Sequence, residues 1–231
     1  MNISIIFPVY NEEKNLEKLI SDWSIELIKN NINHEFVIAE DGSKDNTKNL
    51  IKELERKYPI VNLSQLERRG YSKAVYDGIF AASKQYILCT DSDNQIKVES
   101  LVENLKNFPK NNEFLMGYRN PRKDPLNRLI YSKLFKIYHD ILFNSGLRDP
   151  SCPFVIGLKE TYEKLDKKKL MRMKEGFWWG FVGTCKAQKI KIYEVPIKHY
   201  SRNIGEAGYK LKNLLGIILR NFIGLLKIKF N

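Results

Sequence analysis

The sequence predicts an α/β protein with a mostly parallel central sheet and helices on both of its faces. Short apolar runs rich in β-branched residues alternate with segments of helical periodicity, four times within about the first 90 residues. Polar and acidic residues follow directly after three of these apolar runs. In open parallel sheets ligands bind beyond the carboxyl ends of the strands, so we expect these residues to meet at one edge.

The first half of the chain supplies most of the predicted sheet. Continuous apolar runs, typical of parallel strands that are buried on both faces, predict strands at 3–7, 35–39, 60–63 and 86–90. Helical spacing predicts helices at 15–28 and 71–83, and a further helix that ends at Tyr58, with Ser43 or Asp45 as its cap. Each strand is thus followed by a helix or a polar turn.

The second half is less regular. It predicts strands at 113–118, 154–158 and 191–195 and helices at 126–144 and 176–188. Because no repeat and no Gly, Ser or Pro linker separates the halves, we interpret 1–209 as one domain, with a nucleotide-binding half (1–118) and an acceptor half (119–209).

Composition and charge limit the classes of partner and the cellular location that we expect for the protein. The 231 residues are 43% apolar and 29% charged, as in ordinary globular proteins. The net charge of +12 favours polyanions: nucleic acid, phosphorylated ligands or an anionic membrane surface. We expect no nucleic-acid partner, because helix-turn-helix, zinc-finger and aromatic RNA-binding signatures are absent from the sequence. Three widely spaced cysteines and the lack of a signal-peptide pattern favour a cytoplasmic location.

The segment 210–231 is basic and apolar. On a helical wheel one arc is polar or small and consists of Lys212, Asn213, Gly216, Arg220, Gly224 and Lys227. A wide opposite arc is apolar and consists of Leu214, Leu215, Ile218, Phe222, Leu225 and Leu226. Arg220 at mid-length argues against a spanning helix. Two interpretations stay open: a helix that lies in the interface of a membrane, and a helix that packs on the domain.

Asp91 and Asp93 follow the strand at 86–90 and are followed by Gln95. Oxygen ligands of this kind suit Mg²⁺ or Mn²⁺, which take one or two carboxylates together with substrate phosphates. If the loop is extended, residues two apart point the same way, and the three side chains converge. An aspartate pair alone is weak support, but its place after an apolar strand strengthens the prediction.

Three ordered motifs, at 7–13 (FPVYNEE), 40–47 (EDGSKDNT) and 91–95 (DSDNQ), resemble the inverting glycosyltransferase family 2, whose fold is called GT-A. The D-x-D-x-Q form, Gly117-Tyr-Arg119 and the Arg128/Ser132 pair are most similar to dolichol-phosphate mannosyltransferases and bacterial polyprenyl-phosphate relatives. The resemblance implies a metal-dependent enzyme that moves a sugar from a GDP- or UDP-sugar to a polyprenyl phosphate, as a peripheral protein on the cytoplasmic membrane face.

The resemblance also implies a role for individual residues. In the donor site, Pro8, Tyr10 and Glu12 would hold the nucleoside, and Ala39 and Asp41 would lie against the base or ribose. The rest of the donor site would be Asp91, Ser92 and Asp93, with Arg202 and Lys210 closing over the diphosphate. Asp91, Asp93 and Gln95 would hold Mg²⁺ or Mn²⁺. The catalytic set would be Asp93 with Arg119, Arg128 and Ser132, of which the last three would bind the acceptor phosphate.

A second function stays open at this point. The motifs after Asp149 depart from the family pattern, and Lys210 is displaced from the expected place. The alternative is a family 2 enzyme of polysaccharide or lipopolysaccharide synthesis with a sugar hydroxyl as acceptor. A hydroxyl needs a general base, for which Asp149 is the nearest candidate, whereas a lipid phosphate is already an anion and needs none.

Overall fold

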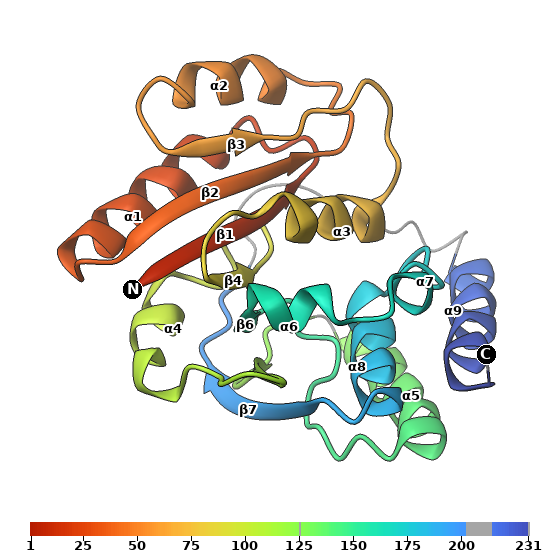
Figure 1. The fold of residues 1–231 in the computed structure, drawn as a ribbon. Helices are drawn as coiled ribbons and strands as arrows, with labels where there is room; N and C mark the ends of the chain where they lie inside the picture. The colour runs from red at the N-terminus through yellow and green to blue at the C-terminus, as the bar shows by residue number, and fades with distance from the viewer. Residues whose placement is uncertain (125, 202–213, 231) are drawn as a thin grey trace.

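The computed structural model describes residues 1–124, 126–201 and 214–230. For four of these residues, including Arg128, it describes the backbone and not the side chain. Arg202 and Lys210, expected to close over the diphosphate, therefore lie outside the described residues. One seven-stranded sheet runs through the molecule in the order β3-β2-β1-β4-β6-β5-β7 (Figure 1). Its strands are β1 (Asn2–Val9), β2 (Asn33–Glu40), β3 (Ile60–Asn62), β4 (Tyr86–Cys89), β5 (Glu113–Arg119), β6 (Val155–Leu158) and β7 (Lys191–Ile197).

The predicted helices form, with ends that shift by a few residues. They are α1 (Leu16–Lys29), α2 (Thr47–Leu54), α3 (Tyr71–Ala81), α5 (Leu126–Phe143), α8 (Phe177–Ala187) and α9 (Leu214–Phe230). Helix α2 stops four residues before Tyr58, and the N–H of Tyr58 closes the last turn on the carbonyl of Leu54. The short elements α4 (Glu99–Val102), η1 (Leu105–Asn107), α6 (Lys159–Glu163) and α7 (Lys167–Leu170) were not predicted, because one turn is too short for a periodic pattern.

Strand β1 is covered on both faces, as its apolar sequence predicts. Phe7 makes an edge-on contact with Trp23 of α1, with ring centroids 5.4 Å apart. The neighbouring Ile6 points to the other face, where its side chain meets Gly78 of α3. Because successive strand residues face opposite ways, α1 and α3 lie on opposite sides of the sheet.

The carboxyl ends of three strands meet at one edge, as expected. Strand β1 pairs in parallel with both β2 and β4. The N–H of Asp41 donates to the carbonyl of Val9 at 2.9 Å, which ties the end of β2 to the end of β1. The hydroxyl of Ser92 donates to the carbonyl of Pro8 at 2.9 Å, which ties the segment after β4 to the same place.

The sheet continues from the first half of the chain into the second. Strand β6 is antiparallel to both β4 and β5, and β5 is parallel to β7. The expected boundary after residue 118 falls inside β5, whose last residue is Arg119. The division into a nucleotide half and an acceptor half therefore stays a prediction about function.

Helices α5, α8 and α9 form a layer at one end of the molecule (Figure 1). A small apolar cluster holds them together: Phe143, Met173, Trp179, Leu225 and Ile228. Gly224 brings α9 close to the 172–173 turn, where any side chain would meet the sulfur of Met173 and the carbonyl of Arg172. Of the two interpretations of the C-terminal segment, packing on the domain is thus observed for 214–230. None of the described helices is long and apolar enough to cross a membrane.

Candidate active site

The end of β2 is joined to the start of α3 by the carboxylate of Asp41, which is 4% exposed. Its two oxygens accept the backbone N–H groups of Arg69 and Gly70 at 2.6 and 2.8 Å. Gly70 has a φ of 98°, a conformation that side chains disfavour, and α3 begins at the next residue. Asp41 therefore fixes the start of α3, and its expected contact with a base or ribose stays a prediction.

The ring of Tyr10 is covered by a guanidinium group. The Arg68 Cζ lies 3.9 Å from the ring centroid, and the Arg68 Nε lies 3.8 Å from Asp41 Oδ2. Arg68 thus joins the end of β1 to the end of β2 by stacking and by charge. A base that stacks on this face of Tyr10 would have to replace or sandwich Arg68.

The other predicted donor residues lie at the same edge in mostly buried positions. Glu12 is 6% exposed, and its carboxylate accepts from Asn15 Nδ2 at 2.7 Å at the start of α1. Pro8 and Ala39 are register partners on β1 and β2. Ser92 is 5% exposed. Their predicted contacts with a nucleoside remain predictions.

The Asp91–Gln95 segment is a turn. The N–H of Gln95 donates to Asp93 Oδ1 at 3.1 Å, and Asn94 takes a left-handed φ of 60°. The segment is therefore not extended, because the Asp93 side chain closes a turn on the backbone two residues later, and the convergence of Asp91, Asp93 and Gln95 stays a prediction. Asp91 Oδ1 accepts from the Tyr71 hydroxyl at 2.7 Å, and Gln95 Nε2 donates to the carbonyl of Tyr200 at 3.0 Å.

These residues fit a hard divalent cation by their chemistry. Asp91 and Asp93 offer carboxylate oxygens, both side chains are partly accessible, and hydrogen bonds hold both carboxylates in place. One or two protein carboxylates are what Mg²⁺ commonly takes when a phosphate supplies further oxygens. Among residues 1–124, 126–201 and 214–230, no three His, Cys, Asp or Glu side chains gather as a metal-binding group.

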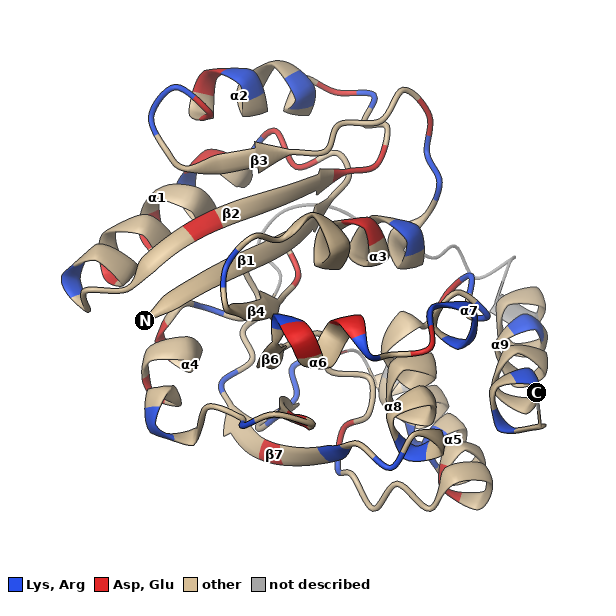
Figure 2. Ribbon diagram, viewed as in Figure 1, with Lys and Arg blue, Asp and Glu red and all other residues tan. Residues whose placement is uncertain are grey.

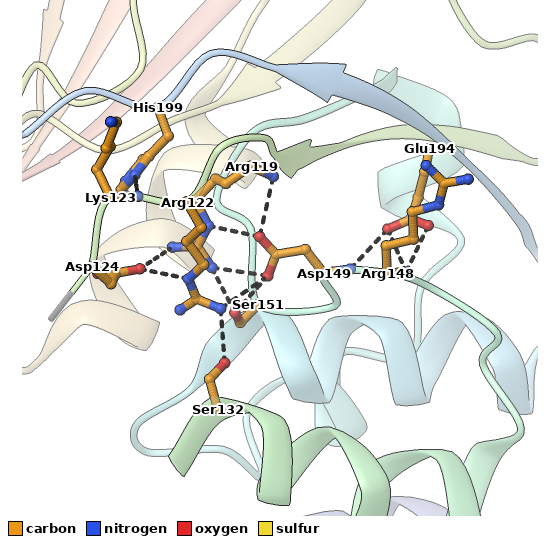
Figure 3. Close-up of polar contacts among 10 residues, drawn as sticks. All are labelled: Arg119, Arg122, Lys123, Asp124, Ser132, Arg148, Asp149, Ser151, Glu194 and His199. Carbon is orange, nitrogen blue, oxygen red and sulfur yellow. Dashed lines mark hydrogen bonds and ion pairs between the residues drawn. The ribbon is translucent and has the colours of Figure 1, made fainter. Parts of the chain in front are cut away.

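Farther along the same edge of the sheet, beyond β6, Arg119 at the end of β5 is paired with Asp149 (Figure 3). Its Nε donates to Oδ2 at 2.7 Å and its Nη2 to Oδ1 at 2.9 Å, while Nη2 also donates to Ser151 Oγ at 2.7 Å. The two charged side chains are only 7% and 9% exposed. Burial by itself would raise the pKa of Asp149, but the hydrogen bonds and charge of Arg119 outweigh it and lower that pKa to about 2.

Arg122 extends this network toward α5. Its Nε donates to Asp124 Oδ2 at 2.5 Å, and its Nη1 donates to Ser132 Oγ at 2.9 Å (Figure 3). The N–H of Lys123 donates to His199 Nδ1 at 3.1 Å. Burial, helped by the charge of Arg119, lowers the pKa of His199 to about 4, so this ring accepts as a neutral imidazole at pH 7.

A cavity of about 160 Å³ opens between α5 and the loop that contains Asp149. Ser132 lines it, as the prediction of an acceptor site requires. Arg119 does not line it, because its guanidinium group is engaged by Asp149 beneath the surface. The backbone of Arg128 lies one turn before Ser132 on α5. The lining residues are Arg122, Leu129, Ser132, Lys133, Lys136, Arg148, Asp149, Pro150 and Trp179.

Four cations of this cavity were missed by the sequence analysis: Arg122, Lys133, Lys136 and Arg148. Helical spacing could have found one of them, because Lys136 lies one turn after Ser132 on the same face of α5. Nothing in the sequence pattern could have found Arg148, which the fold brings from a loop. Its backbone N–H is held by both carboxylate oxygens of Glu194 on β7.

Next to the cavity, α5 and α9 expose apolar side chains. On α5 they recur every three or four residues and so share one face: Leu126, Ile130, Leu134, Ile137 and Ile141. On α9 the pattern is the same: Leu219, Ile223, Leu226 and Phe230. The two helices are in contact through Tyr138 and Phe222, whose ring centroids are 4.0 Å apart. Figure 2 shows Lys and Arg residues on α9 and on the neighbouring α7.

Two relatives among known proteins match most of the chain. A dolichol-phosphate mannosyltransferase of Pyrococcus furiosus is 28% identical over 234 residues, which cover 98% of this chain and 64% of the relative. A dolichyl-phosphate β-glucosyltransferase of Trichomonas vaginalis is 31% identical over 218 residues, which cover 85% of this chain and 65% of the relative. The chain thus spans just under two thirds of the length of these relatives.

Solved structures share the fold. Glucosyl-3-phosphoglycerate synthase of Mycobacterium tuberculosis, in complex with Mn²⁺, uridine diphosphate and phosphoglyceric acid, superposes with a TM-score of 0.69 over 99% of this chain and 78% of that one, at 16% identity. Mannosyl-3-phosphoglycerate synthase of Rubrobacter xylanophilus gives a TM-score of 0.65 over 98% of this chain and 73% of that one, at 12% identity. These likenesses confirm the GT-A fold. The model of glycosyl transferase family 2 matches residues 4–195, and with the motifs at the edge of this sheet it shows that the chain belongs to that family.

Proposed function

We propose that this chain transfers a sugar from a nucleotide diphosphate sugar to a polyprenyl phosphate at the surface of a membrane. The observation that carries the proposal is on α5. One face of the helix lines the cationic cavity through Ser132 and Lys136, and another exposes Leu134 and Ile137. An acceptor that combines a phosphate with a long apolar chain matches both faces at once.

The donor side is assigned to the edge formed by β1, β2 and β4. Tyr10 and Asp41 would contact the nucleoside, and Arg68 would move off the Tyr10 ring or sandwich the base against it. Asp91 and Asp93 would hold Mg²⁺ or Mn²⁺, with the Gln95 amide oxygen as a third ligand. When bound, the cation would act as a Lewis acid that stabilises the charge developing on the diphosphate leaving group.

The acceptor phosphate is assigned to the cavity beside Ser132. Arg122, Lys133 and Lys136 would screen its charge, and the Ser132 hydroxyl would donate to one of its oxygens. Arg119 would act indirectly, because its hydrogen bond to Asp149 would hold the loop that carries Arg148. A phosphate oxygen attacks as an anion, so the residues need only orient it and exclude water.

The alternative acceptor, a sugar hydroxyl, would need a general base. Asp149 is the predicted candidate and does line the cavity. Burial raises its pKa, but the hydrogen bonds and charge of Arg119 outweigh burial and lower the pKa to about 2, which makes Asp149 a weak base at neutral pH. Both of its oxygens also accept from Arg119. These observations favour a phosphate acceptor over a hydroxyl.

The membrane contact is assigned to the exposed faces of α5 and α9 together. Leu126 and Ile141 on α5 are 72% and 76% exposed, and Phe230 on α9 is 73% exposed. Apolar faces of this extent on two adjacent helices favour a lipid surface, and the neighbouring Lys133, Lys227 and Lys229 would be attracted to anionic head groups. The cytoplasmic leaflet is the anionic one, so we assign the protein to that face as a peripheral protein.

A transfer assay tests this function. The purified chain is given labelled GDP- and UDP-sugars with Mg²⁺, Mn²⁺ or a chelator, and either polyprenyl phosphate or a soluble oligosaccharide. We expect a labelled lipid only with polyprenyl phosphate and a cation. Transfer to the oligosaccharide, with no lipid product from any donor, would overturn the proposal.

A pair of lysine variants sharpens the acceptor assignment. Lys136→Ala removes a cation from the cavity and a pair with Asp140 one turn away. Lys18→Ala removes an equivalent pair with Asp22 on α1, far from the cavity, and serves as the control. We expect Lys136→Ala to raise the KM for polyprenyl phosphate several-fold and to leave the KM for the donor unchanged. Equal changes in both KM values would contradict the assignment.

A further inference from the structure

The hydroxyl of Tyr71 connects α8 to the Asp91 carboxylate. Trp178 Nε1 lies 2.8 Å from the Tyr71 hydroxyl oxygen, and that oxygen lies 2.7 Å from Asp91 Oδ1. An indole N–H can only donate and a carboxylate can only accept. The direction of both hydrogen bonds is therefore fixed: Trp178 donates to Tyr71, and Tyr71 donates to Asp91.

Both donors in this series of hydrogen bonds, Tyr71 and Trp178, are held by the core. Tyr71 is the first residue of α3, directly after the Gly70 N–H that Asp41 fixes. Trp178 is 4% exposed and makes edge-on contacts with Phe177 and Phe181, at centroid distances of 5.0 and 5.5 Å. The hydroxyl that reaches Asp91 is thus placed by two helices that cannot shift without disturbing the packing around them.

We propose that Tyr71 and Trp178 are positioning residues that orient the Asp91 carboxylate for the divalent cation. The proposal rests on the proposed function, in which Asp91 is a ligand. Holding Oδ1 toward Tyr71 fixes the rotation of the carboxylate, so the group does not have to be ordered when the cation and the diphosphate arrive. Partners of this kind are worth about 10- to 100-fold in metal affinity in well-studied sites.

The arrangement also gives α8 a role in the donor site. Trp178 belongs to the second half of the chain, and no sequence motif assigns Trp178-Trp179 to a site. Through Tyr71, the α8 helix that packs against α5 and α9 is linked to the residue expected to bind the cation. If Tyr71 and Trp178 served packing alone, loss of the hydroxyl or of the indole N–H would alter stability and leave cation binding unchanged.

The test measures Mn²⁺ binding to the full chain by the loss of the free-ion electron paramagnetic resonance signal, with UDP or GDP present. The variants are Tyr71→Phe, Trp178→Phe and the double variant. Tyr162→Phe is the matched control, since it also removes a buried hydroxyl, one that donates to the carbonyl of Val155 at 3.2 Å. Asp91→Asn tests the underlying metal assignment in the same assay.

We expect Tyr71→Phe to weaken Mn²⁺ binding about 10-fold and Trp178→Phe to weaken it about threefold. The double variant should match Tyr71→Phe, because the indole has nothing to orient once the hydroxyl is gone. Raised Mn²⁺ should restore transfer by Tyr71→Phe, and Tyr162→Phe should bind Mn²⁺ as the native chain does. A loss of activity that added Mn²⁺ does not restore would mark a merely structural role and overturn the proposal.

Two outcomes separate this inference from the proposed function. If Asp91→Asn abolishes Mn²⁺ binding and Tyr71→Phe and Trp178→Phe do not change it, the positioning role is wrong and the metal site stands. If Asp91→Asn leaves Mn²⁺ binding unchanged, both the metal assignment and the positioning role are wrong. Should Tyr71→Phe fail to fold, the expected threefold loss in Trp178→Phe decides the matter alone.

Discussion

Replacing Asp149 with asparagine removes the negative charge that pairs with Arg119 while keeping the size of the side chain. Arg119 would then be a guanidinium group that is 7% exposed, with Asp124 at 3.8 Å as its nearest remaining carboxylate. Leaving a buried charge without its partner typically costs about 3–5 kcal/mol of unfolding free energy.

The pKa of Asp149 gives an independent estimate of this cost. Its lowering from 3.8 to about 2 corresponds to about 2.5 kcal/mol of interaction that favours the charged form in the folded state. We therefore expect Asp149→Asn to lower the free energy of unfolding by about 3 kcal/mol at pH 7. Urea unfolding, followed by tryptophan fluorescence, measures it.

The pH dependence of that cost has a definite sign. Because the folded-state pKa is below the unfolded one, the contribution of Asp149 is complete above about pH 4 and is lost as the pH falls toward 2. The difference between the native chain and Asp149→Asn should shrink over that range. Asp22→Asn, which breaks an exposed pair with Lys18, is the control and should cost less than about 0.5 kcal/mol. A cost of Asp149→Asn below about 1 kcal/mol at pH 7 would refute the reasoning.

Three further predictions concern the metal, a buried histidine and the membrane face. Asp93→Ala should abolish the Mn²⁺-dependent thermal shift caused by UDP or GDP and leave the Tm without ligand nearly unchanged; a retained shift would contradict the metal assignment. Burial lowers the pKa of His139 to about 4, so the free energy of unfolding should fall as the pH drops from 6.5 toward 4, by an amount on the order of 3 kcal/mol. His139→Gln should make that decline shallower in urea unfolding, and the part due to His199, whose pKa is also lowered to about 4, should remain; an unchanged slope would show that protonation of the buried His139 ring does not contribute. Leu134→Glu on α5 should reduce sedimentation with vesicles that contain phosphatidylglycerol, whereas Ile25→Glu on α1, at an equally exposed site, should not; equal losses would place the membrane contact elsewhere.

The first half of the fold could be predicted because its strands are short, apolar and directly followed by polar residues. The apolar runs Ile3–Phe7 and Tyr86–Thr90 can be buried in only one way, as strands of a sheet that has helices on both faces. The position of β6 could not be predicted in the same way. It pairs antiparallel with β4 and β5 and brings Gly157 against Phe114 and Tyr162, neighbours that no local pattern reveals.

The predictions for the site were limited by side-chain hydrogen bonds. The turn at Asn94 is closed by a hydrogen bond from the Gln95 N–H to the Asp93 side chain, a contact that the sequence pattern does not specify. The pairing of Arg119 with Asp149 joins residues 30 positions apart, and the cavity draws Arg148 from a loop. Such contacts form only in the tertiary structure. The sequence pattern therefore predicts which types of residue the site contains, but not which of these residues contact one another.

The most direct measurement compares polyprenyl phosphate with the matching polyprenol, which has the same lipid chain and no phosphate. Each is given to the native chain in mixed micelles with a labelled nucleotide sugar and Mn²⁺, and the label in the extracted lipid is counted. The account predicts a labelled product from the phosphate and none from the alcohol. Comparable labelling of the alcohol would contradict it, because the cationic cavity beside Ser132 would then have no part in selecting the acceptor.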